Sequence, residues 1–163
     1  MARSQSAIAG PVSIPVLYRL FFLYIEPVAT AAGAYLAHFD QYAYMDMTYH
    51  EPVHPVTGVP KPVSIILSQL ANMYLVFAIN EALVLRATSD LKVWRVLLLG
   101  LLIADFGHIW SVNSAGYEVY YRFWEWNSMY WGNLGFVYVG AIMRSCFLLG
   151  AGLAGSTRGK SKR

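Results

Sequence analysis

An aspartate and a histidine stand three residues apart, Asp105 and His108, inside the apolar run "VLLLGLLIADFGHIWSV". A carboxyl group held away from water can donate a proton near neutral pH. A histidine one helical turn away can accept or relay that proton. Glu26, directly before Pro27 in another apolar run, supplies a second acid. These residue types predict a proton-transfer site with Asp105, His108 and Glu26 as its catalytic groups.

The composition places these groups in a membrane protein. Of 163 residues, 57% are hydrophobic and 13% are charged, whereas about 25% of the residues of an average soluble domain are charged. A single domain over residues 1–163 fits this length. The one cysteine, Cys146, excludes an internal disulfide and any mechanism that needs a dithiol pair. The small net charge of +3 argues against a nucleic-acid-binding protein.

Four apolar segments approach the length of about 20 residues that crosses a bilayer as a helix. They cover residues 14–37, 63–85, 93–113 and 132–154. We therefore expect an all-α fold, an integral-membrane four-helix bundle. Four prolines between residues 38 and 62 predict an irregular loop there. The tyrosines and tryptophans of residues 114–131 are typical of a membrane–water interface.

The distribution of basic residues predicts the orientation of this bundle. Eight of them fall on the side that holds both termini and the turn at 86–92, and only Lys61 and Arg122 fall on the opposite side. The eight are Arg3, Arg86, Lys92, Arg95, Arg158, Lys160, Lys162 and Arg163. Because cytoplasmic loops carry an excess of lysine and arginine, we expect both termini in the cytosol and the aromatic-rich loops on the opposite face. The expected compartment is the endoplasmic reticulum.

Charged residues within the spans fall at two depths. With a rise of about 1.5 Å per residue, Arg19 and Glu81 lie roughly 8 Å from the cytosolic boundary, and Glu26, Asp105 and Arg144 about 16–18 Å from it. A charge facing lipid costs about 2.5–3.5 kcal/mol on insertion scales, so these side chains should face the bundle interior. We expect Arg19 and Glu81 to form a structural ion pair. Arg144 either keeps an acid charged or binds an anionic group of a ligand.

Further polar and aromatic residues are candidates for contact with a substrate. Gln69, Asn72 and Asn80 form a polar stripe on the second span, and aromatic rings can stack against a flat apolar ligand. The expected substrate-binding residues are Arg144, Asn72, Asn80, Trp110 and Tyr24.

No metal and no cofactor is expected. The segment "HEPVH" from His50 to His54 has a spacing similar to that of metal ligands, but its proline does not suit a helix. The sequence contains no nucleotide-binding motif either.

The segments "YRLFFLYIEPVATAAGAY", "LANMYLVFAINEALVLRATSDLKVWRVLLLGLLIADFGHIW" and "WGNLGFVYVGAIMRSCFLLG" resemble a family of small fungal four-span membrane proteins with a domain of unknown function, DUF7704. The resemblance covers about residues 14–150 and implies a fungal membrane setting, but no activity. In architecture alone, the chain is similar to integral-membrane terpene cyclases and to emopamil-binding-type isomerases, whose sequence motifs it lacks.

Two functions remain open on the sequence. The first is a membrane-embedded isomerase or cyclase that acts by proton transfer on a lipophilic, isoprenoid- or polyketide-like metabolite, as in terpenoid biosynthesis and secondary metabolism. The alternative is a non-catalytic lipid-binding protein or an accessory subunit of a membrane complex, in which buried ion pairs hold the helices together. The expected partners are a lipophilic small molecule and membrane lipid, with no nucleic acid. A homo-oligomer is compatible with so small a bundle.

Overall fold

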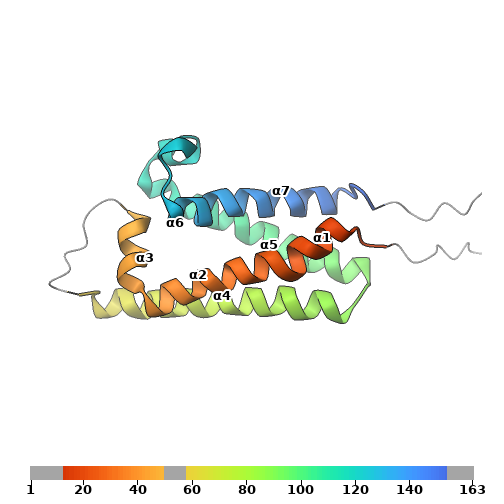
Figure 1. Ribbon diagram of the computed structural model, residues 1–163, viewed down its shortest axis with the longest axis horizontal. Helices are drawn as coiled ribbons and strands as arrows, with labels where there is room; N and C mark the ends of the chain where they lie inside the picture. Colours follow the sequence, from red (N-terminus) through yellow and green to blue (C-terminus); the bar gives the residue numbers. More distant parts are fainter. Residues whose placement is uncertain (1–12, 50–57, 154–163) are drawn as a thin grey trace, which may run out of the picture.

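The computed structural model describes residues 13–49 and 58–153, and every regular element in these ranges is helical (Figure 1). The first long helix combines α1 (Val16–Leu20), the π-helical turn η1 (Phe21–Ile25) and α2 (Glu26–Phe39). It is followed by α3 (Gln41–Thr48), α4 (Lys61–Ala87) and α5 (Leu91–Ser111). Three 3₁₀ turns come next: η2 (Val112–Ala115), η3 (Tyr117–Tyr120) and η4 (Phe123–Glu125). The last helix combines α6 (Ser128–Tyr130), the π-helical turn η5 (Trp131–Gly135) and α7 (Phe136–Leu148).

The long helices form two packed pairs. α2 lies along α4, and α5 lies along α7 (Figure 1). The α4–α5 turn lies at the same end of the bundle as α1 and the end of α7, whereas α3 and the 3₁₀ turns lie at the opposite end. At the first end, the Tyr18 hydroxyl donates a hydrogen bond to the Ala151 carbonyl at 2.9 Å.

An aromatic core closes the bundle at this end. Phe22, Trp94 and Phe147 are almost fully buried, and Leu98 packs with them. Burying a large apolar side chain contributes about 1.5–3 kcal/mol. The indole nitrogen of Trp94 donates to the Thr88 carbonyl at 2.9 Å, so this core also fixes the α4–α5 turn.

Three helices in the described part of the chain are long and apolar enough to cross a membrane: Val16–Phe39, Lys61–Ala87 and Leu91–Ala115. The all-α fold is therefore confirmed, and three of the expected segments form helices that are long and apolar enough to cross a membrane. The fourth expected span, 132–154, overlaps the helix from α6 to α7, which ends at Leu148, and this helix is not among the three. Asn133 and Arg144 lower the mean hydropathy of that segment.

The prediction of an irregular loop over 38–62 is wrong for the part that forms α3. The side chain of Asp40 accepts a hydrogen bond from the Ala43 amide at 3.3 Å and caps this helix. No proline interrupts residues 41–48. Pro60 and Pro62 stand at the start of α4, where a proline is tolerated because the first amides of a helix need no helical acceptor.

The π-helical turn η1 sets the direction of α2. The Glu26 amide donates to the carbonyl of Phe21, five residues back instead of four. Pro27 has no amide hydrogen, so the Leu23 carbonyl lacks its usual helical donor. The Arg86 guanidinium supplies that donor at 2.9 Å, and it also lies 4.5 Å from the ring centre of Tyr24. The end of α4 thus holds the bend in the first helix.

Candidate functional site

A single buried guanidinium joins carboxyl groups from three other helices. Arg144 on α7 is 3% exposed, and its Nη1 donates to Oδ2 of Asp105 on α5 at 2.6 Å. Its Nη2 donates to Oε1 of Glu26 on α2 and lies 3.6 Å from Oε1 of Glu81 on α4. The planar fork of arginine suits this arrangement because it offers several donors in fixed directions. We call Glu26, Glu81, Asp105 and Arg144 the acid–arginine cluster.

Gly140 makes room for this cluster. It lies four residues before Arg144, on the same face of α7. A Cβ atom at this position would lie 2.8 Å from Arg144 Nη1 and 3.3 Å from Glu26 Oε1. The absence of a side chain at Gly140 therefore lets the guanidinium reach α2.

The cluster contains more acids than bases. Three carboxyl groups surround one guanidinium, and Glu26 and Glu81 are both buried. Oε2 of Glu26 and Oε1 of Glu81 have no hydrogen-bond partner among the described residues. Buried charges are costly unless they are paired, so this excess distinguishes the cluster from a simple ion pair.

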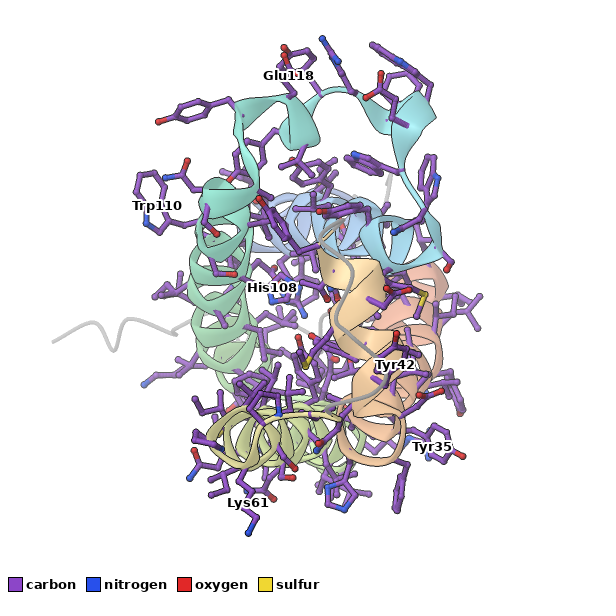
Figure 2. The ribbon with its side chains drawn as sticks, turned by 90° about the vertical axis from the view of Figure 1, so that its left-hand side faces the viewer. Tyr35, Tyr42, Lys61, His108, Trp110 and Glu118 are labelled. Carbon is purple, nitrogen blue, oxygen red and sulfur yellow. The ribbon has the colours of Figure 1, made fainter. Side chains whose placement is uncertain are left out.

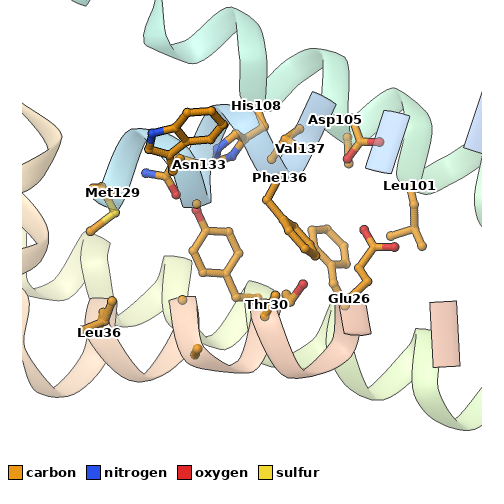
Figure 3. A pocket seen from close by; sticks show the side chains of 18 of the residues that line it. Glu26, Thr30, Leu36, Leu101, Asp105, His108, Met129, Asn133, Phe136 and Val137 are labelled. Carbon is orange, nitrogen blue, oxygen red and sulfur yellow. The ribbon is translucent and has the colours of Figure 1, made fainter. Parts of the chain in front are cut away.

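A cavity of about 390 Å³ lies beside the cluster, between the α2–α4 pair and the α5–α7 pair. Figure 3 shows Glu26 and Asp105 approaching it from opposite walls, with Phe136 near Glu26. His108 and Met129 lie toward the other end. The cavity therefore has a charged end and a mainly apolar remainder.

His108 lies one helical turn beyond Asp105 and points into the bundle (Figure 2). Its imidazole forms a hydrogen bond with the backbone of Asn133 in η5, while its Nε2 is buried without a partner in the described chain. Its ring centre is 6.4 Å from that of Tyr74, whose hydroxyl lies 3.2 Å from the hydroxyl of Tyr44. The cavity thus offers an unused imidazole nitrogen at the end away from Arg144.

The structure brings four of the predicted site residues together, because Glu26, Asp105, His108 and Arg144 all line the cavity. Both terminal nitrogens of Arg144 contact carboxyl groups of the chain itself. This arrangement fits the first of its two expected roles, keeping an acid charged, better than capture of an anionic ligand.

The other four predicted substrate-binding residues do not line this cavity. Asn72 and Asn80 are exposed on the outer face of α4. Asn72 is nine residues from the buried Glu81, about two and a half helical turns, so the two side chains point in opposite directions. Trp110 is 70% exposed and points away from the bundle (Figure 2). Tyr24 is 54% exposed and packs under Arg86.

The predicted ion pair between Arg19 and Glu81 is wrong. Arg19 is exposed, and Glu81 approaches Arg144 instead. The turn η1 adds about one residue to the helix between Arg19 and Glu26, which rotates the two side chains onto different faces. Counting a uniform rise per residue also predicted different depths for Glu81 and Arg144. Such a count ignores helix tilt and side-chain length.

Sequence reasoning also missed Tyr74, Asn133 and Gly140 as parts of the site. One signal was present: Ala71, Ala78, Glu81 and Leu85 recur at helical spacing and are all buried. Tyr74 follows the same spacing and lines the cavity. These buried residues mark the inner face of α4, whereas the polar stripe of Gln69, Asn72 and Asn80 does not.

The described residues contain no group of three or more histidine, cysteine, aspartate and glutamate side chains suited to a metal ion. The segment from His50 to His54 lies outside the residues that the structure describes.

The fold and the site define an all-α protein with long apolar helices and an internal cavity that contains an acid–arginine cluster. The chain belongs to the DUF7704 family, a domain of unknown function whose family model matches residues 12–154. The resemblance seen in the sequence is therefore confirmed. Comparison with curated proteins and with solved structures gave no match.

Proposed function

We propose that the chain is a four-span membrane protein that isomerises or cyclises a lipophilic molecule by proton transfer, without a cofactor. The helix from α6 to α7 packs along α5, and its 21 residues, from Ser128 to Leu148, extend about 30 Å. This length matches the hydrocarbon core of a bilayer. The excess of basic residues beside the termini and the α4–α5 turn supports a cytosolic position for that end.

The observation that carries the proposal is the excess of carboxyl groups at the wall of a cavity. If all three acids were charged, two negative charges would remain unbalanced away from water. At least one acid therefore carries a proton. Glu26 and Glu81 both line the cavity, and each has one oxygen without a partner in the described chain. We propose that these two acids share the proton and that Glu26 donates it to the substrate.

The remaining groups divide the chemistry between them. Asp105 is bonded to Arg144 and lies at the charged end of the cavity, where it stabilises positive charge that develops on the substrate. His108 Nε2 accepts a proton from a neighbouring carbon of the substrate. One proton enters and one leaves, so the product is an isomer of the substrate.

The cavity also defines the class of substrate. Its volume of about 390 Å³ lies within the range of sites for small molecules, roughly 300–1,000 Å³. Three carboxyl groups disfavour an anionic lipid. A neutral, mainly apolar molecule with an alkene, epoxide or carbonyl fits best, which includes isoprenoid- and polyketide-like compounds.

A second candidate rests on the same hydrogen bonds. Arg144 contacts both Asp105 and Glu26. In this second candidate, the cluster has no catalytic role and only joins the two helix pairs around a bound lipid. The protein would then be a lipid-binding protein or an accessory subunit.

Turnover by one variant tests the proposal. Membranes that contain the wild type, Asp105→Asn or Glu118→Gln are incubated with neutral isoprenoid and polyketide extracts, and products are identified by mass spectrometry. Glu118 is an exposed residue of the 3₁₀ region, so its variant is the matched control. We expect the wild type and the control to form an isomer of one component, and Asp105→Asn to lose about 100-fold or more in rate. Full turnover by Asp105→Asn would exclude the assigned role.

A further inference from the structure

Three amide side chains face outward from a helix that is apolar enough to span a membrane. Gln69, Asn72 and Asn80 are exposed on α4. Asn72 lies eleven residues after Lys61, about 16 Å along the helix, which places it deep in the hydrocarbon region. An amide without a hydrogen-bond partner is unfavourable in such surroundings. The cavity does not explain these residues, because they lie on the other side of α4.

Gln69 and Asn72 belong to a regular seam. Ile65, Gln69, Asn72, Val76, Ile79 and Leu83 alternate in steps of four and three residues, and all six are exposed. This is the spacing with which two helices pack as a left-handed pair. Figure 2 shows α4 at the edge of the bundle, with Lys61 at its start pointing away from the other helices. We call these six residues the α4 seam.

We propose that the α4 seam binds the same seam of a second copy of the chain. Copies inserted in one direction share a two-fold axis along the membrane normal, so their α4 helices are parallel and equal residues meet at equal depth. Asn72 then faces Asn72 of the other copy, and Gln69 faces Gln69. An amide both donates and accepts hydrogen bonds, so identical amides pair, whereas identical charges would repel. Amide pairs between membrane helices are a known source of association.

This inference rests on the membrane-spanning arrangement of the proposed function but not on the proposed chemistry, because the seam and the cavity lie on opposite sides of α4. A second copy of the chain fits the seam because the amides match themselves in depth and chemistry, which a lipid chain cannot do.

Disulfide cross-linking of the full chain in membranes tests the seam. The background variant is Cys146→Ser, and single cysteines are introduced as Val76→Cys in the seam and Ile142→Cys on the exposed face of α7. Under mild oxidation we expect Val76→Cys to give a product of twice the chain mass and Ile142→Cys to remain monomeric. Equal cross-linking at both positions, or a product with a different protein, would overturn the proposal.

A second pair of variants tests the amides themselves. In the Val76→Cys background, Asn72→Leu should lower dimer formation about tenfold, and Asn72→Gln, which keeps an amide, should retain most of it. Both positions are exposed in the single chain, so the fold should persist, as circular dichroism can verify. Undiminished cross-linking in Asn72→Leu would exclude pairing through the amides.

Discussion

Arg144 on α7 donates a hydrogen bond to Asp105 on α5 across 2.6 Å. The same guanidinium bonds Glu26 on α2, so one side chain joins the two helix pairs of the bundle. These contacts lie at the wall of the cavity, so we expect them to affect both the stability of the bundle and the charge at that wall.

Removing Arg144 should destabilise the protein strongly. Arg144→Leu leaves Glu26, Glu81 and Asp105 buried without their cation, and loss of one partner from a buried pair typically costs about 3–5 kcal/mol. Denaturant-induced unfolding in detergent micelles measures the change. The control is Arg122→Leu in the exposed pair with Glu118, which should cost about 1 kcal/mol or less. Equal effects of the two variants would show that the cluster does not hold the helices together.

Exchanging two charges separates the catalytic from the structural role. In the double variant Arg144→Glu and Glu26→Arg, the ion pair is restored in the opposite direction, so we expect stability to recover part of the loss seen in Arg144→Leu. Proton transfer requires an acid at position 26, so turnover should stay absent. Recovery of both stability and turnover would favour the non-catalytic alternative.

Arg86 should stabilise the bend in the first helix. Its guanidinium supplies the donor that Pro27 cannot give to the Leu23 carbonyl. Arg86→Leu leaves this carbonyl unsatisfied, at a cost of about 1–3 kcal/mol, and Arg86→Lys should cost less because it keeps a donor. Thermal unfolding compares both with Arg95→Leu, an exposed position on α5 that should have little effect. If Arg86→Leu unfolds like the control, water or another group satisfies the carbonyl.

Gly140 should be intolerant of a side chain. In Gly140→Ala the new Cβ would lie 2.8 Å from Arg144 Nη1, so the guanidinium must move away from Glu26. Such overpacking typically costs about 1–3 kcal/mol, and turnover should fall with it. The control is Gly100→Ala on α5, where nothing lies within 4 Å of the added Cβ. This change should stabilise the helix by about 0.5–1 kcal/mol. A neutral Gly140→Ala would mean that the cluster is not closely packed.

The positions of the long helices were predictable because an apolar run of about 20 residues is most simply explained as a helix that crosses a membrane. The runs 63–85 and 93–113 correspond to α4 and α5 within two residues at all four ends, and residue 113 falls in the adjoining turn η2. The segment that forms α3 was missed because nearby prolines outweighed the Asp40 cap in the prediction. Local capping chemistry acts on few residues and is easily hidden by composition.

The candidate site was predictable where a charge had no alternative to the bundle interior. Glu26, Asp105 and Arg144 lie deep in apolar runs, so burial brought them together. The orientation of α4 was not predictable in the same way, because Asn72 and Glu81 offer polar groups on opposite faces. The turns η1 and η5 also change the helical phase, and neither is visible in a periodic pattern.

Transfer of deuterium from solvent measures the proposed chemistry most directly. Membranes with the wild type or with Glu26→Gln are incubated in D₂O with neutral lipid extract, and the masses of isomeric products are measured by mass spectrometry. If Glu26 donates a proton to the substrate, the wild type will form an isomer that carries one deuterium and Glu26→Gln will not. An isomer that forms equally in both samples, or no isomer in either while a lipid remains bound in the cavity, would contradict proton transfer by this site.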